Sequence, residues 1–170
     1  MKWLIVIWLL AAGVGVSYSV VAERRNMLRQ LGEMGHSLKR LAYYMYQWRM
    51  PVKDAVAHAA KEEQEFLHSF YLGIQEKLIK RQTEDFGILW QEESCEIFKS
   101  CHLPEEIRKI WSDSFVHIPM ESEALNKRLT ERAEKIADYA VELQEKYKGE
   151  QRLVFTLGFF VSAFFCLILW

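Results

Sequence analysis

The sequence predicts an all-α protein, a bundle of about six helices flanked by one transmembrane helix at each end. Both ends of the 170-residue chain are apolar, because every charged side chain except Lys2 lies between Glu23 and Arg152. Between these ends apolar residues recur every three or four positions, the period of a helix with one buried face. No run alternates apolar and polar residues between turn residues, so nothing in the sequence predicts a strand.

The first and last elements are the apolar runs Trp3–Ala22 and Leu153–Trp170, which hold 20 and 18 residues without a charge. At about 1.5 Å per residue each would reach roughly 27–30 Å, the thickness of the hydrocarbon layer. Cations lie at the inner ends of both runs, namely Arg24, Arg25, Lys146, Lys148 and Arg152. The positive-inside rule then predicts a two-span cell-membrane protein, with spans over 1–22 and 153–170 and a cytoplasmic helical bundle over 23–152.

An alternative interpretation treats the first run as a secretory signal. Lys2 would serve as its basic start, and Val20-Val21-Ala22 offers small residues for a peptidase. Cleavage would leave a secreted interaction domain with a single span. Arg24 and Arg25 favour the retained span, because translocated mature ends tend to avoid such charge.

The first helix of the central segment is expected to continue straight out of the first run. Its apolar seam repeats at spacings of four and three over Met27, Leu31, Met34, Leu38, Leu41, Met45 and Trp48. Pro51 should end it, since proline clashes with a carbonyl one turn back but is welcome at the start of the next helix. A short helix then carries Val52, Ala55, Val56 and Ala59.

Four further helices complete the predicted bundle. Amphipathic patterns cover Glu62 to about Arg81 and Ile88 to Phe98. Pro104 with two following acids marks another helix start, whose buried face would carry Ile107, Ile110, Trp111 and Phe115. After a break at Pro119 a second long seam runs towards the other apolar run, with Gly149 as its weak point, over Leu125, Leu129, Ala133, Ile136, Ala140, Leu143 and Tyr147.

The composition predicts neither nucleic-acid binding nor catalysis. Residues 23–152 hold 21 Lys and Arg against 23 Asp and Glu, so no broad basic field would attract nucleic acid. Cys95 and Cys101 precede the lone His102 without the paired spacing of a zinc site, and a reducing compartment suits these thiols. Phosphate-binding glycine loops and the common hydrolase motifs do not occur. We therefore expect a non-enzymatic protein without a cofactor.

One pattern favours a metal enzyme instead. Glu33 with His36 and Glu65 with His68 repeat the Glu-x-x-His spacing by which di-iron carboxylate bundles hold their metals. The two further glutamates would be Glu96 and Glu131. Because Met34 and Leu38 point inward, Glu33 and His36 should face the solvent flanks, and we prefer a solvated face to a metal site.

Two sets of residues are candidates for binding other macromolecules. Three acidic runs could dock a basic partner, and they contain Glu62, Glu63, Glu65, Glu92, Glu93, Glu96, Glu105 and Glu106. Small residues recur every fourth position in the apolar runs, which lets helix backbones approach closely inside lipid, at Ala11, Gly15, Ser19, Gly158 and Ser162.

The layout resembles the bacterial stage III sporulation protein AB family, small proteins with one span at each end of a helical domain. The matching features are the stretch 25–31 after the first span, the helix from Leu38 to Tyr46, Pro51 followed by Ala55, Trp90, Ala140, the stretch 145–148, and Gly158 in the final span. Val52, the turn at 118–121 and the approach to the last span at 149–152 depart from the family pattern.

The resemblance implies a function that composition alone does not give. The family belongs to a secretion-like assembly between mother cell and forespore, and its domain is similar to the cytoplasmic domain of type II secretion and pilus platform proteins. The protein would be a membrane platform that docks a cytoplasmic ATPase at the mother-cell side of the forespore membrane. Its partners would be that ATPase, other membrane subunits of the channel, the lipid bilayer and a second copy of the chain.

Overall fold

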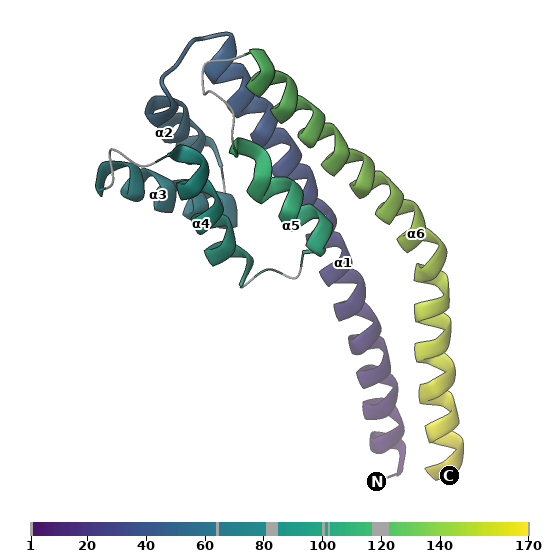
Figure 1. Ribbon diagram of the computed structural model, residues 1–170. Helices are drawn as coiled ribbons and strands as arrows, with labels where there is room; N and C mark the ends of the chain where they lie inside the picture. Colours follow the sequence, from purple (N-terminus) through teal and green to yellow (C-terminus); the bar gives the residue numbers. More distant parts are fainter. Residues whose placement is uncertain are drawn as a thin grey trace. The chain divides into compact units, whose positions relative to one another are not determined.

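The computed structural model describes residues 2–63, 65–80, 85–99, 101, 103–116 and 123–169. Within some helices it describes the backbone only, at 2–14, 16–17, 65–66, 151–155, 158–159, 161–163 and 165–169. Its helices are α1 (Lys2–Tyr46), α2 (Val52–Glu62), α3 (Glu65–Lys80), α4 (Phe86–Phe98), α5 (Glu105–Ser112), the 3-10 turn η1 (Asp113–Phe115) and α6 (Glu123–Leu169) (Figure 1). No strand occurs among the described residues, and the prediction of an all-α fold with about six helices is confirmed.

The chain divides into two compact units, each with its own packing. Unit 1 contains Met1–Arg29 and Ala140–Trp170, and unit 2 contains Gln30–Tyr139. Across the described residues, no helix combines the length and the apolar character that a membrane crossing needs. The spans expected at 1–22 and 153–170, and the domain bounds that depend on them, stay predictions.

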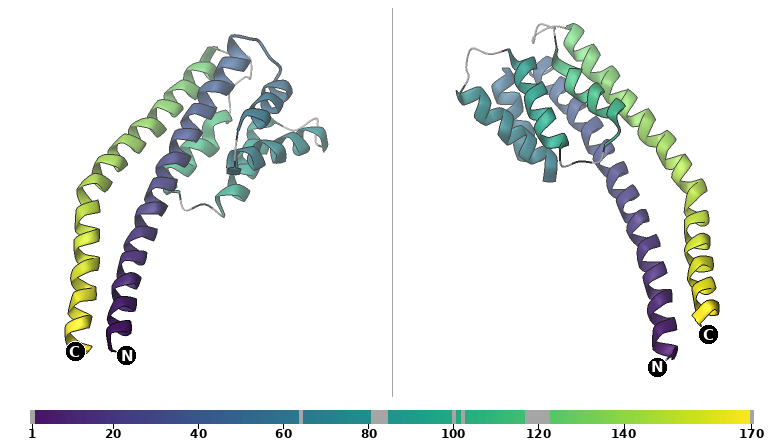
Figure 2. Two further views of the ribbon diagram at one scale, coloured as in Figure 1. Left: turned by 180° about the vertical axis from the view of Figure 1, so that it is seen from behind. Right: turned by 60° about the horizontal axis from the view of Figure 1, so that its bottom comes forward.

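Unit 1 is an antiparallel pair of helices in which the two ends of the chain lie side by side (Figures 1 and 2). Contacts of Arg24 and Tyr147 join its segments. Arg24 Nη2 lies 3.0 Å from Glu150 Oε2, the Arg24 guanidinium carbon lies 4.5 Å from the centre of the Tyr147 ring, and the Tyr147 hydroxyl donates to Met27 Sδ over 3.7 Å. A guanidinium over an aromatic face is held by both charge and dispersion. These contacts fix the register of the helix pair.

Unit 2 contains the hydrophobic core. Within it α2 to α5 lie together beside the C-terminal part of α1 (Figures 1 and 2). The predicted seam of α1 is buried from Leu31 to Leu41, and the seam of α6 is buried from Leu125 to Ile136. These helices approach closely, because a Cβ added at Gly35 would lie 3.3 Å from the Ala133 carbonyl oxygen. Burying each large side chain stabilises the fold by about 1.5–3 kcal/mol relative to exposure.

A cluster of aromatic rings fills the space between α3, α4, α5 and η1. Trp90 is fully buried, and its ring centre lies 4.7 Å from Phe70, 5.0 Å from Trp111 and 4.5 Å from Phe115. Its indole N–H donates to the Trp111 carbonyl over 2.8 Å, which satisfies the one polar atom of this side chain. Trp90, singled out in the sequence as a family feature, therefore lies at the centre of the core.

The expected end of the first helix is wrong by four residues. α1 ends at Tyr46 rather than at Pro51, and Trp48 is 53% exposed instead of continuing the seam. The chain leaves the helix through hydrogen bonds from Gln47 N and Trp48 N to the Tyr43 carbonyl, and Arg49 has a φ of 50°. A left-handed residue just beyond a helix is a common terminator, although glycine usually occupies it.

Other boundaries move by one to three residues. Glu62 ends α2 instead of opening the next helix, because Glu63 is extended with φ −81° and ψ 155°. Helix α4 starts two residues earlier than expected, since the Asp85 side chain accepts from Gly87 N at 2.8 Å and caps it. Pro51 and Pro104 precede α2 and α5 as cap residues, and α6 continues through Gly149. The break expected at Pro119 lies outside the described residues.

Candidate functional site

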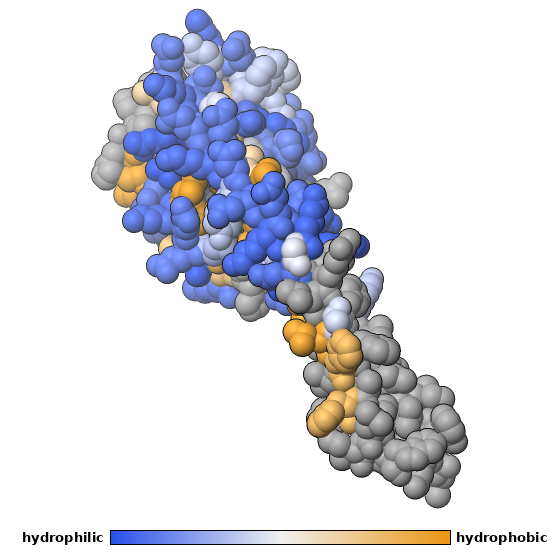
Figure 3. Space-filling view, turned by 90° about the vertical axis from the view of Figure 1, so that its right-hand side faces the viewer, coloured by the Kyte–Doolittle hydropathy of each residue, from blue (hydrophilic) through white to orange (hydrophobic). Residues whose placement is uncertain are grey.

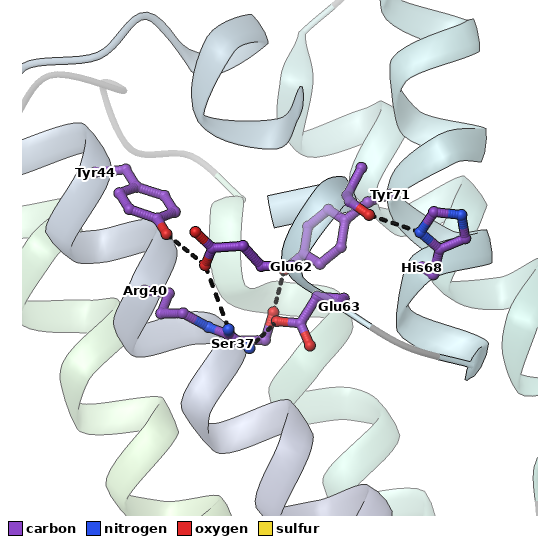
Figure 4. Close-up of polar contacts among 8 residues, drawn as sticks. Ser37, Arg40, Tyr44, Glu62, Glu63, His68 and Tyr71 are labelled. Carbon is purple, nitrogen blue, oxygen red and sulfur yellow. Dashed lines mark hydrogen bonds and ion pairs between the residues drawn. The ribbon is translucent and has the colours of Figure 1, made fainter. Parts of the chain in front are cut away.

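The first acidic run forms a polar cluster at the junction of α2 and α3 (Figure 4). Glu63 Oε1 lies 2.6 Å from Arg40 Nη2, and Glu62 Oε2 lies 3.4 Å from Arg40 Nη1. The Tyr44 hydroxyl donates to Glu62 Oε2 over 2.6 Å. One guanidinium of α1 thus holds the two carboxylates that end α2. The side chain of Glu65, the third member of the run, lies outside the described residues.

Burial sets the electrostatics of this cluster. Glu63 is only 8% exposed, and burial raises the pKa of its carboxyl, while Ser37 and Arg40 oppose the rise. Burial, followed by the hydrogen bond to Glu62, raises the pKa of Tyr44 to about 12. Burial likewise raises the pKa of Tyr71, whose hydroxyl shares a buried hydrogen bond with the Ser37 hydroxyl. Ser37 also hydrogen-bonds the Glu63 carboxylate, so these buried hydroxyl groups all have hydrogen-bond partners.

The second acidic run lies on α4 and is divided by its contacts. Lys77 of α3 lies 2.9 Å from Glu93 Oε2 and 3.7 Å from Glu92 Oε2. The Glu93 carboxylate rests against Gly73 and occupies the space that a Cβ at this position would need. Glu93 therefore binds α4 to α3, whereas the Glu96 side chain is 66% exposed beside Lys99. Glu92, Glu96 and the exposed Cys95 border an open depression of about 520 Å³.

The third acidic run opens α5. Glu105 and Glu106 occupy its first turn, are both exposed, and complement the positive end of the helix dipole. Hydrophilic side chains cover much of the face of unit 2 that Figure 3 presents. The sequence-predicted docking residues thus lie on three elements, the α2–α3 junction, α4 and α5, and they differ in how far their charge is already paired.

The small residues predicted for helix packing are only partly described. The side chains of Ala11 and Ser162 lie outside the described residues, and so does Gly158 beyond its backbone. Gly15 and Ser19 are exposed, and a Cβ added at Gly15 would meet no described atom within 4 Å. The packing role of this set stays a prediction.

The di-iron interpretation finds no support in the described geometry. His36 is exposed, Glu33 is half-buried, and the His68 Nδ1–H donates to the Ala60 carbonyl over 2.6 Å. Glu96 and Glu131 are exposed, and Glu131 lies 3.9 Å from Lys127. The described residues contain no group of three His, Cys, Asp or Glu side chains that could hold a metal ion.

Sequence reasoning missed two sets of contacts. Arg40 is not among the residues that the sequence singles out, and no sequence signal links it to carboxylates more than 20 residues away. The contact of Arg24 with Tyr147 and Glu150 could have been found, because Tyr147 already ends the predicted α6 seam and a further step of three reaches Glu150. The same extension of the α1 seam backwards from Met27 reaches Arg24.

Comparison with known proteins identifies the family. No curated protein and no solved structure matches this chain. The all-helical fold agrees with the helical domain that the family resemblance implied. A sequence model described as stage III sporulation protein AB matches residues 2–170, and the chain therefore belongs to the stage III sporulation protein AB family.

Proposed function

We propose that this protein is a non-enzymatic platform subunit of a secretion-like sporulation channel. Two membrane spans would hold unit 2 at the mother-cell side of the forespore membrane, where it would dock a cytoplasmic ATPase. Membership of a stage III sporulation family supports the sporulation role. The resemblance to the sporulation family implies a domain similar to secretion and pilus platform domains, and this supports the ATPase as partner. Hydrolysis would belong to that partner.

The pairing of α1 with α6 in unit 1 is the observation that carries this proposal. Arg24 follows the first apolar run by two residues, and Glu150 precedes the second by three. Because their side chains lie 3.0 Å apart, the inner ends of both runs are level with each other. Two apolar helices that start level and run antiparallel are suited to cross one bilayer together, with their cations on the same side.

The described surface of unit 1 also supports lipid contact. Leu157, Phe160 and Phe164 are 62%, 64% and 62% exposed, and they follow one another at helical spacing along α6. In Figure 3 orange, hydrophobic side chains lie in the lower part of unit 1, beside the grey residues. A row of exposed large apolar residues is unfavourable in water and favourable against acyl chains.

The docking surface is proposed to include the acidic residues whose charge is least paired within unit 2. Glu96, Glu105 and Glu106 are exposed, in contrast to Glu63 and Glu93, which hold neighbouring helices together. Exposed carboxylates steer a basic partner and set its orientation without being needed for the fold. This separation allows docking to be tested without unfolding the domain.

The test is crosslinked capture of the tagged full-length protein from its own sporulating cells, with the recovered proteins identified by mass spectrometry. We expect a secretion-type ATPase, and we expect it to be lost when residues 30–139 are deleted. The triple variant Glu96→Gln, Glu105→Gln, Glu106→Gln should recover less ATPase. Its matched control neutralises three exposed acids of α6, Glu131→Gln, Glu134→Gln and Asp138→Asn, and should recover as much as the wild type. Equal loss in both variants would refute this surface, and no ATPase from any variant would refute the platform.

A further inference from the structure

We propose that the cavity at the inner end of the unit 1 helix pair binds the phosphate headgroup of an anionic phospholipid. The cavity has a volume of about 180 Å³ and is bordered by residues of both helices. Val21, Leu28 and the Tyr147 ring give it apolar walls, and Arg24, Arg25 and Lys148 give it charge. The inference rests on the proposed membrane spans, because they place this cavity at the level of the headgroups.

The charge of the cavity is not balanced by its own lining. Three of its lining residues are cations and none is acidic, while Glu150 pairs with Arg24 alone, which leaves two positive charges. Arg25 and Lys148 are exposed and form no ion pair within the described part of the chain. An anion entering between the helices would therefore meet Arg25 from α1 and Lys148 from α6 together.

Arg24 adds a donor that has no acceptor. Its Nη2 reaches Glu150 and its guanidinium plane lies over Tyr147, but its Nη1 is buried without a hydrogen-bond partner among the described residues. A buried donor left unpaired is unfavourable by about 1–3 kcal/mol. A phosphate oxygen would satisfy it, since the planar guanidinium donates readily to phosphate.

The surroundings favour a lipid over a free anion. The cavity is lined by Val21 of the first apolar run and by Tyr147 and Lys148 of α6, which precede the second run. A headgroup bound there would direct its acyl chains along the exposed apolar side chains of α6. Val21 and Leu28 offer contact to the glycerol and first methylenes, which inorganic phosphate does not have. Basic pockets beside spanning helices are a known mode of lipid-headgroup recognition.

The experiment measures lipid retention by the full-length protein in detergent, using native mass spectrometry with phosphatidylglycerol or phosphatidylcholine of identical acyl chains. We expect wild-type protein to retain phosphatidylglycerol preferentially. The double variant Arg25→Ala, Lys148→Ala should weaken that retention roughly tenfold or more, as expected for two cations near a headgroup. Both side chains are exposed, so helix content by circular dichroism should not change.

The matched control is Lys39→Ala with Lys135→Ala, which removes two exposed cations from the same two helices but outside unit 1. It should retain phosphatidylglycerol like the wild type. Equal weakening in the control, no weakening in the double variant, or no preference over phosphatidylcholine would each overturn the proposal. Full competition by inorganic phosphate would also overturn it, in favour of a free anion.

Failure of the platform proposal gives a different signature. If the capture experiment recovers no ATPase, the platform proposal fails, but the preference for phosphatidylglycerol in the lipid-retention experiment should not change. Extraction of the protein from vesicles by alkaline carbonate would instead show that the spans are wrong, whatever the lipid preference in detergent.

Discussion

Arg40 joins α1 to the end of α2 through two ion pairs. It is the cation shared by Glu62 and Glu63, and Glu63 is the more deeply buried of the two. The position follows Leu38 by two residues, off the apolar seam, so a sequence pattern describes it as a surface basic residue. Its partners come from the α2–α3 junction, and such a long-range pairing is set by tertiary packing rather than by local preference. The sequence therefore predicts the apolar seam around Arg40 but not the ion pairs that Arg40 forms.

Replacing Arg40 by methionine should destabilise the protein at neutral pH by about 1–3 kcal/mol. The lower part of that range is expected because the Arg40 side chain is 38% exposed and water screens it. Without Arg40, burial holds the pKa of Glu63 still further above its unfolded value. The contribution of Glu63 to stability is then fully present below its pKa in the unfolded state, and it is lost as pH rises through its pKa in the folded state.

The Arg40→Met deficit should therefore shrink towards acid pH, where Glu63 is protonated in both states. Thermal unfolding followed by circular dichroism across a pH series measures this. Lys39→Met removes an adjacent exposed cation and is the control. A deficit that is independent of pH would mean that the Glu63 carboxylate is not the group left unpaired.

Arg49 provides a second residue-scale prediction, from backbone conformation alone. Its φ of 50° is unfavourable for a side chain with a Cβ by about 1–2 kcal/mol, and glycine escapes that penalty but loses more chain entropy on folding. Arg49→Gly should raise stability by a few tenths to about 1 kcal/mol, and Arg49→Val should lower it by about 1 kcal/mol. Melting temperatures of the two variants should lie on opposite sides of the wild type. If both variants melt above the wild type, or both below it, residue 49 does not keep the left-handed conformation in solution.

Helices were easier to predict than their ends. The 4-3 spacing finds α1 and α6 because a buried face is a property of many residues at once, and each misplaced residue weakens the pattern only slightly. Ends depend on a single cap or dihedral. The Asp85 cap on α4 and the extended Glu63 after α2 each moved a boundary, and neither follows from apolar periodicity. Trp48 shows the consequence, since it lies two residues beyond the end of α1 and loses its expected place in the seam.

The contact between α4 and η1 gives a prediction at the level of the element. A Cβ added at Gly87 would lie 2.7 Å from the Phe115 carbonyl oxygen, and a backbone atom cannot rotate away. Gly87→Ala should therefore destabilise the protein by about 1–3 kcal/mol, as overpacked sites do. Gly32→Ala is the control, because nothing lies within 4 Å of its position and alanine favours the helix by up to about 1 kcal/mol. Melting curves in which both variants gain stability would contradict the tight contact.

At the scale of the whole molecule, the sequence predicts the all-α class and the family, and the structure adds the register of the chain ends. Antiparallel pairing in unit 1 requires both apolar runs to point the same way from the charged segment. The sequence does not predict which acidic residues form ion pairs within the fold and which stay exposed. That difference depends on which carboxylate lies beside Lys77 or Arg40 after folding.

The proposed orientation can be tested with the thiols that the protein already has. Cys95 is exposed on α4 in unit 2, and a Cys101→Ser background removes the second thiol of that unit. A membrane-impermeant maleimide should label Cys95 in inside-out vesicles and leave it unlabelled in intact cells, with Cys95→Ser as the blank. Labelling in intact cells would put unit 2 on the outer side and favour the secreted alternative.

The contact between Met27 and Tyr147 joins residues 120 positions apart, and the Gly35–Ala133 approach joins two more that are nearly as distant. During synthesis, the α1 residues of these contacts are made long before the α6 residues. Met27 and Gly35 therefore lack their α6 neighbours until about one hundred further residues have been synthesised. Completion of unit 2 is a late event in the life of the nascent chain, and truncated products that end before α6 should be substrates for chaperones and proteases rather than partly working proteins.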